Sequence, residues 1–151
     1  MAQKSKRNYI VEMALPLFLE QGFKGTSIDL VVKISGVSKP TVYNHFPDKT
    51  ALMLAVVQNW CDQRRPIVNP IKTRKMLDNE IDKTWLNDDT VKFYALVIGE
   101  GRKFGEAKKI FWEEFDARWR QAFAESSKAL VSPNELDLIL DQQLLHRLKQ
   151  L

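Results

Sequence analysis

The sequence predicts an all-α fold in two parts, an N-terminal three-helix unit with a connecting fourth helix and a longer helical region after it. Apolar residues recur every three or four positions along most of the 151 residues, as on the buried face of a helix. Beyond residue 63 no strand pattern appears. Gly22, Gly36 and Pro133 fall where helices would begin or end, whereas Pro16 lies inside the first helix. The first helix carries Ile10, Ala14, Leu17 and Phe18 on one side, and Gly22 marks its end. The stretch that follows decides the interpretation.

That stretch, residues 26–49, predicts two short helices joined by a tight turn. Thr26 and Ser27 each offer a side-chain oxygen to the first free N–H groups of a helix. Gly36 follows where this helix must end, because glycine tolerates the left-handed conformation of a C-cap. Ser38 can cap the second helix, and Pro40 lies in its first turn, where a missing N–H costs little.

The second short helix, SKPTVYNHF, has two distinct faces. Val42 and Phe46 lie four residues apart and form its buried stripe. The residues left to face outwards are Lys39, Thr41, Tyr43, Asn44 and His45. Lysine can donate to guanine, asparagine can pair with adenine, and a threonine methyl can meet that of thymine. This polar, aromatic and basic face is the arrangement that places a helix in the major groove of DNA, with a packed or solvent-facing His45 as the alternative for that residue.

Composition fits this interpretation without deciding it. The net charge is +4, and residues 1–60 carry seven Lys/Arg against four Asp/Glu, so most of the excess lies with the helix-turn-helix. A solvated face would explain the same excess, just as a frayed terminus or a DNA-contacting arm would explain the basic residues Lys4, Lys6 and Arg7. With one cysteine and two distant histidines, we expect no disulfide, metal, cofactor or enzymatic activity. No apolar run reaches the ~18 residues of a membrane span, and a cytoplasmic location is expected.

Residues 9–54 resemble the DNA-binding domain of the TetR family of bacterial transcriptional regulators. The matching pieces are ALPLFLEQGFKGTSI, GVSKPTVYNHF and PDKTALM. The resemblance implies phosphate contacts from Thr26, Tyr43 and Lys49. It implies base or groove contacts from Lys39, Pro40, Thr41, Asn44 and His45, and the predicted DNA-binding set is completed by Ser27 and Ser38.

Lys49 also stands out by its position at the start of a fourth helix. A cation there opposes the helix macrodipole, which suggests an external anion. The alternative is an exposed lysine without a partner.

The segment RRPIVNPIK marks a change of composition, and we place the domain boundary there. The prediction is a DNA-binding domain over 1–62, including the connecting fourth helix, and a helical regulatory and dimerisation domain over 63–151, which is short for the family. In the second domain, apolar spacing predicts helices over 76–86, 91–103 and 108–130, and a final helix from Ser132–Pro133.

Aromatic residues are concentrated in this second domain. In the family it usually binds a small molecule, and the residues that could line an apolar pocket here are Trp85, Phe93, Tyr94, Phe104, Phe111, Trp112, Phe115 and Trp119, with Phe123 beside them. An aromatic stripe at helical spacing is ordinarily core, and that is the alternative.

Leucines spread over more than one face of the final helix, which a second copy of the chain would cover most simply. Because the family usually dimerises through two final helices, the chain is either a naturally short member or a cut one. The predicted function is a repressor that binds an inverted-repeat operator in double-stranded DNA as a homodimer and is released by a small hydrophobic effector. The alternative is a protein-interaction module that uses the helix-turn-helix only as a scaffold.

Overall fold

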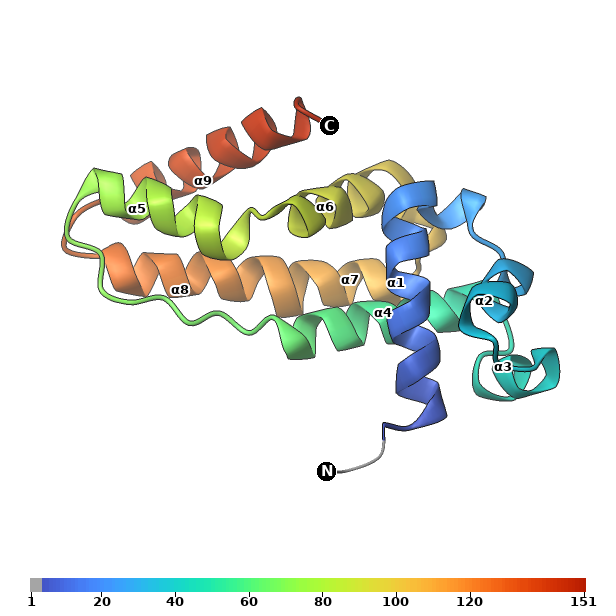
Figure 1. Cartoon of the computed structure of the whole chain (residues 1–151). Coiled ribbons are helices and arrows are strands. Elements are labelled where there is room, and N and C mark those ends of the chain that lie inside the picture. Colours follow the sequence, from blue (N-terminus) through green and yellow to red (C-terminus); the bar gives the residue numbers. More distant parts are fainter. Residues whose placement is uncertain (1–3) are drawn as a thin grey trace. The chain divides into compact units, whose positions relative to one another are not determined.

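The structure, a computed structural model, describes residues 4–151 (Figure 1). Every regular element in this part of the chain is helical, which confirms the all-α prediction. The chain divides into two compact units, which we describe separately. The first contains the chain up to Gln63 together with Leu96–Phe111, and the second contains Arg64–Ala95 and Trp112–Leu151.

The expected domains, 1–62 and 63–151, differ from these units in one segment. One division falls between Gln63 and Arg64, but Leu96–Phe111 packs with the N-terminal helices although it lies beyond the expected boundary. As a statement about parts that fold and act separately, the domain assignment stays a prediction. Its residues 1–3 lie outside the described residues.

The first unit is built around α1, which packs against both α2 and α4, while α4 also packs against α7 (Figure 1). Its helices are α1 (Lys6–Gly25), α2 (Ile28–Ser35), α3 (Lys39–His45), α4 (Lys49–Gln63), the end of α6 (Asp88–Glu100), η2 (Gly101–Lys103) and α7 (Glu106–Ile110). Fully buried side chains, among them Ile10, Phe18, Val31, Leu52 and Trp60, form its core. Because each is apolar, their removal from water is the main force that holds these short helices together.

The predicted end of the first helix at Gly22 is confirmed as a break in the backbone. Gly22 has φ 74° and ψ 175°, which are not helical angles. After Gly22 the chain makes one more helical turn and leaves the helix at Thr26. A positive φ is strained for any residue with a side chain, so glycine is the residue that fits here. Phe23, which follows, turns its ring into the core.

The second unit carries the end of the chain. Its helices are α5 (Arg74–Glu80), η1 (Ile81–Trp85), the start of α6, η3 (Phe111–Asp116) except for its first residue, α8 (Ala117–Ser127) and α9 (Pro133–Leu148). The segment between α4 and α5 has no helix and is fastened to α8. Trp119 Nε1 donates to the Arg64 carbonyl (3.0 Å), the Ile71 N–H donates to the Ser126 carbonyl (2.9 Å), and the Ser126 hydroxyl donates to the Val68 carbonyl (3.1 Å).

Two predicted helices are interrupted, and the interruptions are wide turns. The expected helix over 76–86 changes to a π-helix at Ile81–Trp85, and the expected helix over 108–130 contains a second π-helix at Phe111–Asp116. The expected helix over 91–103 begins earlier, at Asp88, and its last turn is a 3₁₀-helix. π-Turns carry no local sequence signal, so hydrophobic spacing alone gave one continuous helix in each case.

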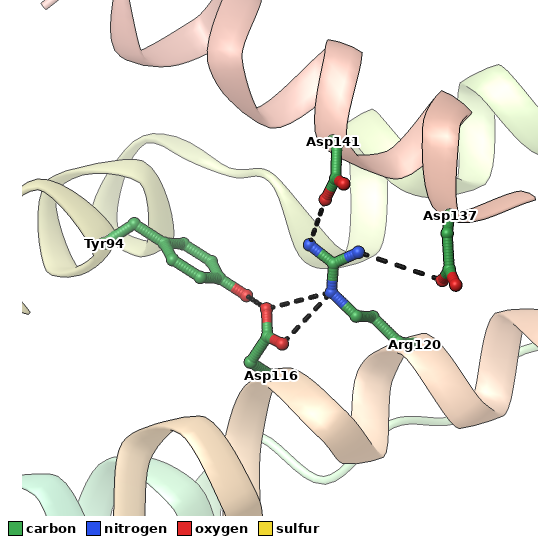
Figure 2. Close-up of polar contacts among 5 residues, drawn as sticks. All are labelled: Tyr94, Asp116, Arg120, Asp137 and Asp141. Atoms are coloured by element: carbon green, nitrogen blue, oxygen red, sulfur yellow. Dashed lines mark hydrogen bonds and ion pairs between the residues drawn. The ribbon is translucent and has the colours of Figure 1, made fainter. Parts of the chain in front are cut away.

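A polar network in the second unit joins Tyr94, Asp116, Arg120, Asp137 and Asp141 (Figure 2). The Tyr94 hydroxyl donates to Asp116 (2.6 Å), and Arg120 Nε donates to both oxygens of the same carboxylate (3.2 and 3.0 Å). Arg120 also reaches α9, where its Nη2 donates to Asp141 (2.7 Å) and its Nη1 lies 4.0 Å from Asp137. Asp116 is 8% exposed, and such burial is tolerated because its oxygens are paired. The network therefore joins α6, α8 and α9.

Candidate DNA-binding interface

The two short helices form as the sequence predicts. The Ser27 hydroxyl accepts the Leu30 N–H (3.0 Å) and so caps α2. Gly36, with φ 69°, ends α2, and its N–H donates to the Val32 carbonyl (3.0 Å). In the turn that follows, the Ser35 hydroxyl accepts the Val37 N–H (3.2 Å). Local capping thus fixes where α2 stops and where the chain turns towards α3.

The inner face of α3 is the one predicted. Val42 is 0% exposed and Phe46 is 1% exposed, which confirms both as core residues. The Arg7 guanidinium lies over the Phe46 ring, 4.6 Å from its centre, in a cation–π contact. Tyr9, also on α1, donates its hydroxyl to the Ser35 carbonyl (3.1 Å). α1 therefore supports the helix-turn-helix through two side chains that the sequence pattern did not single out.

Ser38 occupies the N-cap position of α3 but makes no capping hydrogen bond with its side chain, so that part of the prediction is wrong. Its hydroxyl instead pairs with the Thr41 hydroxyl at 2.7 Å. The pair holds both hydroxyls on the same side of the first turn of α3.

The side chains of α3 that lie outside the core form what we call the outer face of α3: Lys39, Pro40, Thr41, Tyr43, Asn44 and His45. All of them are exposed except Thr41, which is half-buried. Lys39 Nζ lies 2.9 Å from Asp29 and 5.8 Å from the centre of the Tyr43 ring. The hydrogen bond that Lys39 donates to Asp29, followed by the negative charge of that carboxylate, raises the Lys39 pKa above its ordinary value. To contact a DNA base, the Lys39 ammonium group would have to leave Asp29. Both side chains are exposed, so breaking this ion pair costs little.

Thr26 does not lie on this surface. It is 1% exposed, and its hydroxyl donates to the carbonyls of Leu17 (3.1 Å) and Gly22 (2.8 Å). Because the hydroxyl proton is shared between two half-buried carbonyls, the hydroxyl has no proton left to donate to a phosphate. Ser27, its neighbour, is exposed.

Lys49 lies at the first position of α4, as predicted, but it is not a free surface lysine. Its Nζ donates to the Phe23 carbonyl (2.6 Å) and lies 4.4 Å from the centre of the Phe23 ring. Asp48 caps the same helix by accepting the Ala51 N–H (2.8 Å). The alternative of an exposed lysine without a partner is therefore wrong. One of the three N–H donors of its ammonium group is used by the Phe23 carbonyl.

The aromatic residues expected to line a ligand pocket are divided between the units. Phe104 and Phe111 belong to the first unit, and the other six belong to the second. All are at most 5% exposed except the half-buried Trp112. In the second unit they pack on one another, with ring centres 5.9 Å apart for Trp85 and Tyr94 and 5.8 Å apart for Tyr94 and Trp112. They fill core positions in this structure, and contact with an effector stays a prediction.

Within residues 4–151, no group of three or more His, Cys, Asp and Glu side chains is placed to hold a metal ion. Over the same residues, no helix is both long enough and apolar enough to cross a bilayer.

Comparison with known proteins points to one family. Residues 10–56 match the family described as bacterial regulatory proteins, tetR family. Over 71 residues the chain is 35% identical to the uncharacterized HTH-type transcriptional regulator YuxN of Bacillus subtilis (strain 168), an alignment that covers 47% of this chain and 24% of YuxN. In this alignment the chain spans about a quarter of the length of YuxN.

Solved structures extend the similarity to the remaining helices. A protein from Mesorhizobium loti MAFF303099 that is assigned to the TetR family superposes with a TM-score of 0.69 over 97% of this chain and 98% of its own, at 17% identity. The flavonoid-responsive regulator FrrA superposes with a TM-score of 0.61 over 89% of this chain and 77% of its own, at 28% identity. At 17% identity the first comparison establishes the fold alone.

Proposed function

We propose that this chain is a DNA-binding transcriptional regulator of the TetR family, the family of bacterial regulatory proteins that its residues 10–56 match. The observation that carries the proposal is the outer face of α3. Five of its six side chains are polar, aromatic or basic, the exception being Pro40, and Val42 and Phe46 fix α3 to the core from its other face. A rigid helix with hydrogen-bonding side chains on its free side is suited to the major groove.

We propose that the contacts divide by chemistry. Lys39, Thr41 and Asn44 carry the donors, acceptors and methyl group that distinguish base pairs in the major groove. The Tyr43 hydroxyl and the two remaining N–H donors of Lys49 suit phosphate oxygens, which carry no sequence information but set the position on the duplex. The exposed residues Ser27, Ser38, Pro40 and His45 border this set. Thr26 acts by holding the turn, because its hydroxyl donates to two carbonyls inside the unit.

We further propose that the operator is an inverted repeat read by two copies of the chain. One helix-turn-helix makes few contacts, and half-sites spaced about one DNA turn (~34–36 Å) apart supply useful affinity. Support for a second copy comes from α9, whose outward side chains include Leu138 (59% exposed) and Leu145 (53% exposed), with Leu151 (65% exposed) beyond its end. Apolar side chains that recur along one helix face are typical of a surface that is covered in the assembled protein.

A small apolar effector completes the proposal. Support comes from the aromatic side chains of the second unit and from the similarity to FrrA, a regulator described as flavonoid-responsive. Occupancy of an operator that overlaps a promoter blocks transcription, so repression relieved by the effector is the simplest form of the regulation.

The test is selection of bound duplexes from a random-sequence pool by the full chain. We expect an inverted repeat whose affinity falls steeply between about 50 and 200 mM salt. Asn44→Ala should relax the preference at one base pair of each half-site by ~1–3 kcal/mol. Asn79→Ala, at an exposed position on α5, is the matched control and should leave selection unchanged. Recovery of no preferred sequence by the wild-type chain would remove the proposal.

A further inference from the structure

The peptide groups of Phe23 are held from both sides within the first unit. Its N–H donates to one oxygen of the Glu100 carboxylate, and the other oxygen accepts the Lys24 N–H (3.2 Å). Its carbonyl accepts the Lys49 ammonium group (2.6 Å). One peptide segment thus connects the last residue of α6 with the first residue of α4.

Glycine at position 22 makes this arrangement possible. The chain leaves helical geometry at Gly22, so the N–H groups just after it need acceptors from outside α1. A Cβ atom at position 22 would lie 3.0 Å from the Glu100 carboxylate, which is closer than real Cβ contacts normally come. Because Gly22 has no side chain, the backbone can adopt the positive φ of this turn and the Glu100 carboxylate can approach it closely. Hydrogen bonds from N–H groups to a carboxylate are roughly twice as strong as neutral ones.

The Phe23 side chain also contacts Lys49 and the segment that follows Glu100. Its ring is 8% exposed and meets Phe104 edge-on, with centres 5.1 Å apart. The Lys49 ammonium lies over the ring at 4.4 Å. Neither the ring nor the peptide can shift without moving the partner of Lys49.

We propose that Glu100 is a positioning residue for DNA binding. By fixing the Phe23 peptide, it fixes the carbonyl that holds Lys49, and it leaves two N–H donors of Lys49 directed to a phosphate. A cation that is already held in place loses less conformational freedom on binding than a free lysine does. Glu100 itself touches no DNA in this arrangement. This inference rests on the proposed function, because it concerns how that surface is prepared.

Charge alone predicts the opposite effect. A carboxylate in the DNA-binding unit repels the phosphate backbone, so its removal should tighten binding. Glu106 provides the matched comparison, because it is an exposed glutamate in the first turn of α7 in the same unit. Glu100→Gln and Glu106→Gln remove the same charge with the same change of atoms. Only Glu100→Gln puts an amide NH₂ against a backbone N–H that needs an acceptor.

The experiment measures affinity for the duplex that the wild-type chain selects, at several salt concentrations. We expect Glu100→Gln to weaken binding about tenfold, equivalent to ~1.4 kcal/mol. Glu106→Gln should bind as tightly as the wild type or more tightly. Equal effects of the two substitutions would overturn the proposal, and so would tighter binding by Glu100→Gln. If a wild-type chain selects no DNA, the proposed function fails instead, so the two failures are distinguishable.

A double-mutant cycle with Lys49→Ala separates positioning from general loosening of the fold. We expect Lys49→Ala to lower the salt dependence of binding by about one phosphate contact. In that background Glu100→Gln should cost less than about threefold, since the group it positions is gone. A full tenfold loss in both backgrounds would show that Glu100 does not act through Lys49, and would overturn the proposal.

Discussion

The helices α3 and α9 both present side chains that the core does not use, but they are held in different ways. α3 is anchored by the apolar residues Val42 and Phe46, and its outer face is polar. α9 is anchored partly by charged groups, through Arg120 on Asp141 and Arg147 on the Leu86 carbonyl (2.6 Å), and its outward residues include leucines. The contrast supports the proposals that α3 meets a polar surface such as DNA and that α9 meets an apolar one.

The largest expected effect separates the two faces of α3. Phe46→Ala should lower the free energy of unfolding by ~3–5 kcal/mol, because it leaves a cavity under α3 and removes the ring on which Arg7 lies. His45→Ala, one residue earlier on the exposed side, should change it by no more than about 0.5 kcal/mol. Urea unfolding of both variants measures the difference. Similar losses would mean that His45 is a packing residue, the alternative that the sequence left open.

The corresponding change on α9 should affect association and leave folding intact. The double substitution Leu138→Ser and Leu145→Ser should weaken dimerisation by about 100-fold, or ~2.7 kcal/mol, because each copy loses two apolar contacts. Sedimentation at a series of concentrations gives the dissociation constant. Ile67→Ser is the control, because Ile67 is 83% exposed but lies outside α9. An unchanged dissociation constant in the double variant would place the second copy elsewhere.

The network of Tyr94, Asp116, Arg120 and Asp141 that holds α9 should make the free energy of unfolding depend on pH. Burial, and then the adjacent Asp116, raise the pKa of Tyr94 above its ordinary value of 10.0. A raised pKa means that the folded state favours the neutral hydroxyl, so its contribution is present below about pH 10 and is lost as the pH rises further. Tyr94→Phe should cost ~1.5 kcal/mol at pH 8, where the hydrogen bond to a charged acceptor is lost.

Above pH 10 the wild-type chain should lose stability faster than Tyr94→Phe does, and the two should converge. Comparing the two chains cancels the lysines, which titrate in the same range. Parallel curves from pH 8 to pH 11 would show that Tyr94 is not neutral and buried in the folded state, contrary to the network in Figure 2.

How far the sequence predicted these two regions depends on the range of the interactions. The bounds of α2 and the buried stripe of α3 were predictable because caps and helical spacing act over three or four residues. The pairing of Lys49 with Phe23 joins residues 26 positions apart, and that of Glu100 with Phe23 joins residues 77 apart. Tertiary packing creates such contacts, and no local sequence pattern predicts them. The burial of Asp116 belongs to the same class, since it depends on Tyr94 and Arg120 arriving from other turns.

The smallest expected effect compares the starts of α2 and α3, each of which has a serine at its N-cap position. The Ser27 hydroxyl accepts a backbone N–H, so Ser27→Ala should cost ~1 kcal/mol, the usual value for an N-cap. The Ser38 hydroxyl pairs with Thr41 instead, so Ser38→Ala should cost less than about 0.5 kcal/mol. For DNA affinity the order should be reversed, with the larger loss in Ser38→Ala. Without the Ser38 hydroxyl, the Thr41 hydroxyl on the outer face of α3 is no longer held in place. If Ser38→Ala costs as much stability as Ser27→Ala, its hydroxyl caps α3 after all, and Thr41 stands on the surface without that support.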